Sequence, residues 1–402
     1  MSPKSTWCLV RAIFIALLMT SGLVQARTIN NNMNVIDRCW RTNTNWRSHR
    51  HQLARCSVGY AGKMTNNIGR DVINYKVTDP SDDPLNPRPG TLRYAMTNIG
   101  GKTWITFARN MNIKLVKPLL VSSYTTLDGR GVDVHIGDGA CIFLRRVTNV
   151  IIHGLRIRNC MPQGPGPVMG PNRKIVHLGP VDGDAIRMVT STKVWIDHNT
   201  LTDCQDGLID VTRGSTDITI SNNRFKFQNK VMLLGHDDGF RRDTNMRVTV
   251  AFNHFGPQCQ QRMPRVRFGY AHVVNNLYLG WGQYAIGGSM NPNIKSQANL
   301  FIAPQGGNKE IFKHNMIQLI VFKSILIPME TQITWDSSAN GRFKSINDVF
   351  ENGALFKESV DKGAAMRPNY RPDQMFEVAD GRFVRSLTSS AGALRCPRTS
   401  TC

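Results

Sequence analysis

Residues 193–203 read Lys-Val-Trp-Ile-Asp-His-Asn-Thr-Leu-Thr-Asp, which is a short β-branched strand, a polar bend at Asn199 and a second short strand. Similar units occupy residues 149–159, 217–225, 247–255 and 270–278. Successive bend asparagines lie 24, 30, 23 and 23 residues apart, at Asn199, Asn223, Asn253, Asn276 and Asn299. A repeat of this length, built from strand, asparagine and strand, predicts a parallel β-helix, which is an all-β solenoid.

The repeat also predicts how the coils are held together. Each bend asparagine can hydrogen-bond the asparagine of the next coil, because an amide side chain both donates and accepts. Aliphatic side chains from the first strand of each unit should fill the solenoid interior: Val194, Ile196, Ile218, Ile220, Val248 and Val250. A β-sandwich is the alternative, but its hairpins need Gly-rich two-residue turns, which these units lack.

The N-terminal part of the chain differs from the repeat. We expect residues 1–26 to be a signal peptide, because Lys4 and Arg11 precede a short apolar stretch that ends near a cleavage site at Ala26. The apolar stretch is too short to span a bilayer. We expect residues 27–90 to form an N-terminal extension, an arm that wraps the first coils.

The solenoid itself is expected to span residues 91–304. Residues 91–96 should form a short helix that caps its open end, and residues 305–402 should pack along its flank. Within that flanking segment, residues 312–329 carry an apolar run that does not continue the coil period. This run is either a capping helix or the translated sequence of a retained intron.

The chain is strongly basic, with a formal charge of +22 at pH 7. Such a charge suits nucleic acid, an anionic membrane or an acidic polysaccharide. Secretion argues against nucleic acid, and the chain contains no basic amphipathic helix that would favour a membrane surface. An extracellular acidic polysaccharide is therefore the expected partner, bound by a protein that we expect to be a monomer.

Cysteine usage agrees with an extracellular location. Nine cysteines are present, and Cys8 is lost with the signal peptide. The even number that remains favours disulfides in an oxidising compartment. We expect three short-range pairs: Cys39–Cys56, Cys141–Cys160 and Cys396–Cys402. Cys204 and Cys259 either pair with each other or stay buried as thiols.

Four aspartates form the most unusual motif in this basic chain: Asp182, Asp184, Asp206 and Asp210. Asp182 and Asp206 are 24 residues apart, close to one coil, so stacked coils should bring the carboxylates together on one outer face. Like charges at that distance repel, and a calcium ion held by oxygen ligands would relieve the repulsion. Taken singly, each Asp-Gly pair is an ordinary turn, but the one-coil offset favours a metal site.

Basic residues follow the aspartates at a similar spacing. Lys230 lies about one coil beyond Asp206, and Arg262 and Arg267 lie about one coil further along. A row of cations beside a calcium site is suited to binding uronate carboxylates, and the alternative is a solvated basic face. We expect His198, next to the asparagine ladder, to be a buried hydrogen-bonding residue rather than a base.

Several blocks of the sequence resemble the plant pectate lyases. They are Thr91-Leu-Arg-Tyr-Ala, Leu127-Asp-Gly-Arg-Gly131, Asp182-Gly-Asp-Ala-Ile, Val194-Trp-Ile-Asp-His-Asn199, Asp206-Gly-Leu-Ile-Asp210, Ile218-Thr-Ile-Ser-Asn-Asn223, Lys230-Val-Met-Leu-Leu-Gly-His236 and Arg262-Met-Pro-Arg265. The resemblance runs from about Val35 to Pro304. It implies a right-handed parallel β-helix, secreted to the cell wall, that cleaves de-esterified (1→4)-α-D-galacturonan by β-elimination.

The resemblance also implies roles for the charged residues. The implied calcium ligands are Asp182, Asp206 and Asp210, joined by Asp184 once substrate is bound. Arg262 would remove the C5 proton of the uronate, and Lys230 and Arg267 would hold a substrate carboxylate. A guanidinium is almost always protonated, so an arginine base predicts an alkaline pH optimum. The loop at residues 161–180 departs from the family pattern.

Three other functions compete with this interpretation. A polygalacturonase needs paired carboxylates with a water between them, and the adjacent Asp237 and Asp238 do not follow an expected active-site strand. A pectin lyase acts on methylated substrate without calcium, and the retained aspartates argue against it. The main alternative is a catalytically weak, pectate-binding cell-wall protein, because the charge and the groove would serve binding equally well.

Overall fold

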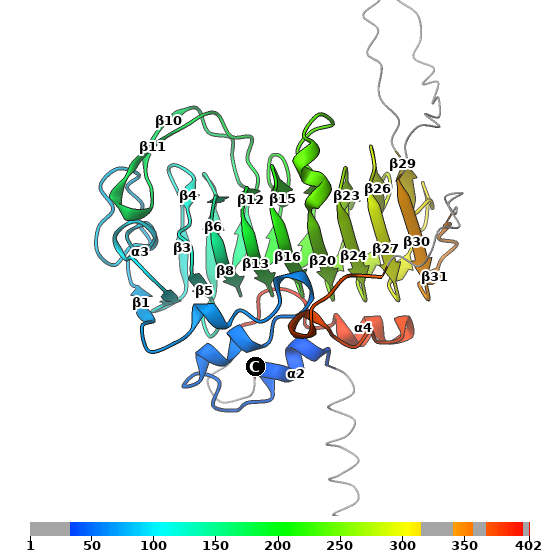
Figure 1. Cartoon of the computed structure of the whole chain (residues 1–402), viewed down its shortest axis with the longest axis horizontal. Coiled ribbons are helices and arrows are strands. Elements are labelled where there is room, and N and C mark those ends of the chain that lie inside the picture. The colour runs from blue at the N-terminus through cyan, green and yellow to red at the C-terminus, as the bar shows by residue number, and fades with distance from the viewer. Residues whose placement is uncertain (1–32, 315–340, 357–366, 397–401) are drawn as a thin grey trace, which may run out of the picture.

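The computed structural model describes residues 33–314, 341–356, 367–396 and Cys402. Its main body is a stack of parallel coils that builds three long sheets of ten, eight and nine strands. Neighbouring strands in these sheets run parallel. Figure 1 shows the strands side by side, with the N- and C-terminal segments gathered along one flank. The predicted parallel β-helix is confirmed.

Each long sheet takes one strand from each successive coil. The first sheet contains β1 (Ile73–Val77), β2 (Thr103–Phe107), β5 (Thr125–Asp128), β8 (Thr148–His153), β13 (Thr192–Asp197), β16 (Thr216–Ser221), β20 (Arg247–Ala251), β24 (Tyr270–Val274), β27 (Asn293–Gln297) and β30 (Arg342–Ile346). The second sheet contains β4 (Leu119–Leu120), β7 (Ile142–Arg145), β12 (Ile186–Val189), β15 (Ile209–Thr212), β19 (Met232–Leu234), β23 (Arg265–Val266), β26 (Ile286–Gly288) and β29 (Phe312–His314). The third sheet contains β3 (Met111–Ile113), β6 (Val134–Gly137), β9 (Arg156–Arg158), β14 (Thr200–Thr202), β17 (Arg224–Lys226), β21 (His254–Phe255), β25 (Leu277–Leu279), β28 (Leu300–Ile302) and β31 (Val349–Glu351).

Two small sheets and a few short helices complete the described chain. The small sheets pair β10 (Gly166–Met169) with β11 (Ile175–Leu178) and β18 (Gln228–Lys230) with β22 (Cys259–Gln261). The α-helices are α2 (Val35–Arg41), α3 (Leu92–Asn98) and α4 (Val384–Leu387). The 3₁₀ turns are η1 (Arg50–Arg55), η2 (Gly59–Ala61), η3 (Thr65–Asn67), η4 (Pro171–Arg173), η5 (Arg241–Asn245), η6 (Pro372–Gln374) and η7 (Gly381–Phe383). None of the helices in these ranges is long and apolar enough to cross a membrane.

The interior of the solenoid follows the repeat. Strand register sets Val194 beside Ile218 and Ile218 beside Val248. All six aliphatic residues expected inside are fully buried. The bend asparagines form the expected ladder, in which each Nδ2 donates to the Oδ1 of the next asparagine over 3.0–3.1 Å, from Asn199 to Asn299. Packing and a satisfied buried amide row therefore hold the coils in one register.

The stack of strands extends beyond residues 91–304 at both ends. β1 pairs with β2, and β29, β30 and β31 lie after residue 304. These outer coils lack an asparagine at the ladder position. At the C-terminal end, Asp348 takes the ladder position and accepts a hydrogen bond from Asn299 Nδ2 over 3.0 Å. The repeat period in the sequence therefore identifies only the coils in which asparagine occupies the bend, and it misses the outer coils.

The N-terminal segment, residues 33–72, packs on the outer face of the first sheet. Its aromatic residues join a buried cluster that includes Trp40, Trp46, Trp104 and Trp195. The backbone N–H groups of Tyr60 and Ala61 donate to Thr249 Oγ1 and Thr219 Oγ1 over 3.1 and 3.0 Å. The segment is therefore ordered and reaches the middle coils, whereas we expected an arm around the first ones.

Short-range disulfides and a helical cap complete the structure. The three expected disulfides are present: Cys39–Cys56, Cys141–Cys160 and Cys396–Cys402. Cys204 and Cys259 are buried free thiols. The expected helix near residue 91 is α3, whose N-cap Thr91 accepts a hydrogen bond from the Tyr94 N–H over 3.3 Å. The expected signal peptide and most of residues 312–329 lie outside the described residues.

Candidate active site

The four aspartates singled out in the sequence lie on the outer side of the second sheet. Asp182 and Asp184 precede β12, Asp206 precedes β15, and Asp210 lies within β15. β12 and β15 are hydrogen-bonded neighbours, so the one-coil offset sets the carboxylates beside one another. One carboxylate oxygen from each of Asp182, Asp184 and Asp206 lies within 4.8 Å of the other two. We call the four residues the acid group.

Glycine allows the carboxylates to come this close. A Cβ atom at Gly207 would lie 2.6 Å from Asp210 Oδ1 and 2.9 Å from Asp184 Oδ1. Any side chain at residue 207 would therefore push these two aspartates apart. The Gly207 N–H instead donates to Asp184 Oδ1 over 2.9 Å. The Asp-Gly turn is thus part of the site, because its missing side chain leaves room for the carboxylates.

The acid group carries more negative charge than its surroundings neutralise. Asp184 is buried, and its Oδ2 has no hydrogen-bond partner among the described residues. Burial and the neighbouring Asp210 raise the pKa of Asp184 well above its ordinary value. Burial, followed by Asp206 and Asp182, raises the pKa of Asp210 to about 7. Both shifts mean that the folded protein disfavours these negative charges, so a cation bound here would stabilise them.

Two cationic side chains contact the edges of the acid group. Lys230 Nζ lies 2.7 Å from Asp206 Oδ1, and Arg187 Nη1 lies 3.1 Å from Asp182 Oδ1. Both pairs are partly exposed to solvent, so each contributes little to stability. Lys230 was expected near Asp206. Arg187 was not singled out, although its place between the buried Ile186 and Met188 on β12 marks it as an outward-facing residue.

Arg262 lies in the bend after β22, next to the acid group. Its carbonyl accepts a hydrogen bond from the Met232 N–H over 2.7 Å, and its Nε is buried without a hydrogen-bond partner in the described chain. Its φ of 63° is left-handed, but other bends share this conformation, so φ alone does not distinguish it. Arg187 and then Arg262 oppose the increase in the pKa of Asp210. The guanidinium therefore acts electrostatically on the acid group.

The other arginines of this region are held in different ways. Arg267 Nε lies 3.0 Å from Asp238 Oδ1, and its Nη1 donates to the Gly235 carbonyl over 3.0 Å. Arg267 is therefore engaged away from the acid group. Arg265 faces outward from β23, where Val266 points inward, and burial lowers its pKa with a further contribution from Arg267.

Tyr284 is a second residue that the sequence pattern did not suggest. It is almost fully buried. Burial raises the pKa of its hydroxyl, and the nearby Arg265 and Arg262 oppose that increase. Nothing in the repeat sets Tyr284 apart from other aromatic residues of the coils, so the sequence held no signal for its position beside the arginines.

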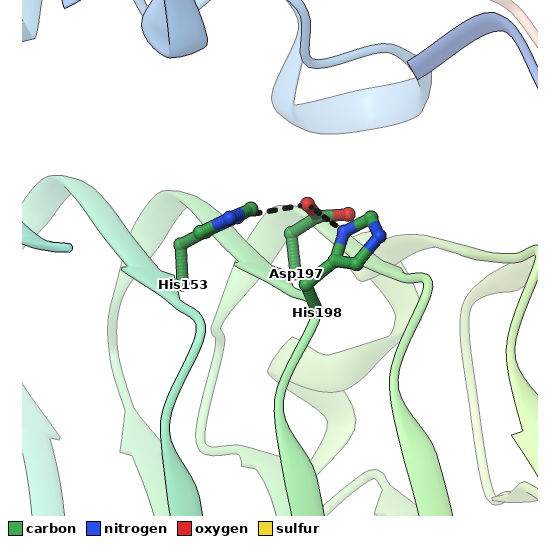
Figure 2. A group of neighbouring side chains, drawn as sticks. All are labelled: His153, Asp197 and His198. Atoms are coloured by element: carbon green, nitrogen blue, oxygen red, sulfur yellow. Dashed lines mark hydrogen bonds and ion pairs between the residues drawn. The ribbon is translucent and has the colours of Figure 1, made fainter. Parts of the chain in front are cut away.

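Only one other group of metal-ligating side chains occurs in the described ranges, and it has a different character. Figure 2 shows Asp197 between His153 and His198. Asp197 Oδ2 lies 3.0 Å from His153 Nδ1 and 2.7 Å from His198 Nδ1, and Asp37 Oδ1 lies 3.0 Å from His198 Nε2. All four side chains are buried, and the Trp40 ring contacts both imidazoles edge-on. We call them the histidine group.

The two carboxylates of the histidine group are paired with cationic side chains. Burial opposes a charged imidazole, but Asp197 and Asp37 outweigh this effect and raise the pKa of His198 to about 9. Burial lowers the pKa of His153 to about 4. One imidazolium and one neutral imidazole thus lie between two carboxylates, and Arg41, 2.9 Å from Asp37 Oδ2, offsets the remaining negative charge. The expectation that His198 is a buried structural residue is confirmed.

Comparisons with known proteins agree with this geometry. The family model described as pectate lyase matches residues 112–318. Pectate lyase 1 of Juniperus virginiana is 47% identical over 365 residues, covering 90% of this chain and 94% of that protein. Pectate lyase 1 of Cryptomeria japonica is 45% identical over 372 residues, covering 92% and 94%.

Solved structures give the same result. The crystal structure of jun a 1, the major allergen from cedar pollen, matches with a TM-score of 0.81 and 44% identity, and the match covers 90% of this chain and 99% of that one. A Bacillus subtilis pectate lyase shares the fold, with a TM-score of 0.61 at 16% identity over 84% of this chain and 97% of that one. The chain therefore belongs to the pectate lyase family, a family of polysaccharide lyases.

Proposed function

We propose that this pectate lyase cleaves de-esterified (1→4)-α-D-galacturonan by calcium-dependent β-elimination, with Arg262 as the base that removes the C5 proton. One observation carries the proposal: four clustered carboxylates, paired with cations only at their edges, lie within electrostatic reach of Arg262, whose buried Nε has no hydrogen-bond partner in the described chain. Elimination next to a uronate carboxylate needs both features. The negative charge of that carboxylate must be offset, and a base must reach the adjacent carbon.

The residues of the acid group fit a calcium ion. Calcium takes six to eight oxygen ligands, including carboxylates that bind through one or both oxygens. Asp182, Asp206 and Asp210 would be the protein ligands, and Asp184, whose Oδ2 has no hydrogen-bond partner in the described chain, would be a further ligand once substrate is bound. A calcium ion held by these aspartates would supply positive charge beside the substrate carboxylate and reduce the negative charge that resists proton removal.

Lys230 and Arg267 would hold substrate carboxylates. Each of them now contacts an aspartate, Asp206 and Asp238 respectively. Such partly exposed pairs are worth at most about 1 kcal/mol, so exchange of the aspartate for a uronate carboxylate costs little. Arg262 would act in its neutral form, which becomes more abundant as the pH rises. We therefore expect the rate to increase toward alkaline pH.

The expected setting is outside the cell, at the cell wall. Three disulfides suit an oxidising compartment, and a formal charge of +22 suits an anionic polysaccharide. We infer that the protein acts as a monomer and that it engages neither nucleic acid nor membrane. Size-exclusion chromatography of the secreted protein, with light scattering, tests the oligomeric state.

The test of the mechanism is the ultraviolet absorbance of unsaturated uronate released from polygalacturonate, with calcium and with a chelator. Arg262→Ala should lower the rate by about 10²–10⁴-fold, the usual contribution of a general base, while calcium binding is retained. Arg262→Lys keeps the positive charge, and its rate of product formation should also be severely reduced. A folded wild-type protein that binds polygalacturonate without forming product would support the pectate-binding alternative. Undiminished activity in Arg262→Ala would exclude Arg262 as the base.

A further inference from the structure

A pocket of about 380 Å³ opens beside the acid group on the outer side of the second sheet. One wall is the end of β11 and the loop that follows it, from His177 to Val181, and the floor is formed by β7 and β12. Figure 1 shows the β10–β11 hairpin reaching outward at this end of the sheet. The basic side chains that line the pocket belong to Arg145, Arg146, His177, Arg187 and Arg213.

The lining contains no carboxylate side chain. Among the described residues, only Arg187 of the four arginines has an ion pair with an acid, Asp182 at 3.1 Å. The other three, Arg145, Arg146 and Arg213, are exposed, and the Arg213 guanidinium lies 6.0 Å from the centre of the Phe240 ring. Several uncompensated cations around one concave surface attract an anionic ligand. The pocket therefore suits a chain of carboxylates.

The pocket lies next to the acid group along the second sheet. Along the second sheet the strands follow the order β23, β19, β15, β12, β7. Asp210 on β15 pairs in register with Arg187 on β12, which pairs with Phe143 on β7. Neighbouring strands lie about 4.8 Å apart, so the pocket floor begins on β12, about 5 Å from Asp210. Arg262 lies on the opposite side of the acid group, toward β23.

We propose that this pocket is an additional substrate subsite, in which Arg145, Arg146, Arg187 and Arg213 bind carboxylates of galacturonate units beyond the bond that is cleaved. The inference rests on the proposed function, because it assumes the same polymer. A chain lying along the outer face of the second sheet would cross Arg262 and the acid group and then enter the pocket. The protein therefore binds long de-esterified chains more tightly than short ones.

Arg187 is not a suitable residue for the test, because it also contacts Asp182 in the acid group. Arg145 and Arg213 contact no acid in the described chain and lie on the rim. The informative variant is therefore Arg145→Gln/Arg213→Gln. Arg382→Gln/Arg385→Gln is the matched control, because it removes two exposed arginines from the C-terminal segment on the other flank of the molecule.

The experiment is calorimetric titration of the full protein with trigalacturonate and with decagalacturonate, in calcium at low ionic strength. The wild type and the control should bind the long oligomer at least about tenfold more tightly than the short one. Arg145→Gln/Arg213→Gln should lose most of this length preference and keep the wild-type melting temperature. A preference that persists in this variant would overturn the subsite, and so would an equal loss in the control.

The same titration separates this inference from the proposed function. If the wild type shows the length preference but releases no unsaturated product, the pocket stands as a binding site and the elimination mechanism fails. If the wild type releases product but binds both oligomers equally, the pocket is not a subsite and the mechanism is unaffected.

Discussion

The acid group and the histidine group both bring carboxylates together, yet they differ in how their charge is balanced. In the histidine group, Asp197 and Asp37 enclose the His198 imidazolium at 2.7 and 3.0 Å, and the Trp40 ring contacts both imidazoles edge-on. In the acid group, the cations Lys230 and Arg187 contact only the edges, and a buried oxygen of Asp184 has no partner in the described chain.

The difference explains why one group is structural and the other is a candidate ligand site. A buried charge is tolerated only where a partner offsets its desolvation. The histidine group contains its own partners and so holds the N-terminal segment against the first sheet. The acid group lacks them, so a bound cation would complete it. A cluster of metal-type residues is thus informative only when its internal pairing is known.

Removal of the shared carboxylate of the histidine group should have the largest effect on stability. Asp197→Asn leaves the buried His198 with one acidic partner instead of two. Breaking a buried pair in this way typically costs about 3–5 kcal/mol, so the denaturation midpoint should fall sharply. Calcium affinity of the remaining folded protein should be unchanged, because Asp197 belongs to a different sheet from the acid group.

Asp380→Asn is the control for this change. Asp380 forms an exposed pair with Arg382 at 2.6 Å, and its loss should leave the midpoint unchanged. If Asp197→Asn folded as stably as the wild type but bound calcium weakly, the roles given to the two groups would have to be exchanged.

Stability should also fall between neutral and alkaline pH because of His198. Its pKa is raised to about 9 in the folded protein, whereas an ordinary histidine titrates near 6.5. A raised folded pKa gives a contribution that is complete below about pH 6.5 and is lost as the pH rises through about 9. The difference corresponds to a loss of up to about 3 kcal/mol.

Urea denaturation at pH 7, 8, 9 and 10, with calcium in excess, measures this loss. His198→Gln removes the titrating group, so the variant, although less stable, should show a flatter pH dependence. An equal slope in the variant would mean that another group controls alkaline unfolding. This loss of stability bears on function, because the proposed Arg262 base is more active at alkaline pH, where the contribution of His198 to stability is lost.

Much of the fold could be predicted from one repeated feature. A buried amide must be satisfied and an interior must be filled, so regularly spaced asparagines and aliphatic residues determine the coil and its register. The same regularity stops at Asn299, where Asp348 replaces the next asparagine. The N-terminal segment has no repeat, and its place on the middle coils depends on the shape and polarity of the surface it covers.

The candidate site could be predicted only as far as the backbone determines it. The one-coil offset brings Asp206 beside Asp182, since neighbouring strands fix where these residues lie. The position of a long, flexible side chain is set by whichever partner is near. Arg267 therefore contacts Asp238 and Arg187 contacts Asp182, neither of which any spacing suggested. The pocket was missed for a similar reason, because its wall comes from the irregular loop at residues 161–180.

The smallest of the expected effects tests the acid group directly. Asp184→Asn keeps the oxygen that accepts the Gly207 N–H but removes a charge that burial and Asp210 disfavour. Stability without calcium should therefore stay the same or increase slightly. Calcium affinity in the presence of an oligogalacturonate should fall at least about tenfold, because Asp184 is proposed to join the ligands once substrate is bound and affinity depends on the number of charged ligands. Calorimetry gives the affinity, and thermal unfolding in chelator gives the stability.

Asp203→Asn is the matched control, because Asp203 is an exposed aspartate near the acid group whose left-handed φ of 53° asparagine also tolerates. It should change neither quantity. If both variants weakened calcium binding equally, the effect would reflect the general field of the protein rather than ligation. If Asp184→Asn destabilised the calcium-free protein as strongly as Asp197→Asn, Asp184 would be structural, and incomplete pairing would no longer distinguish a ligand site from a buried ion pair.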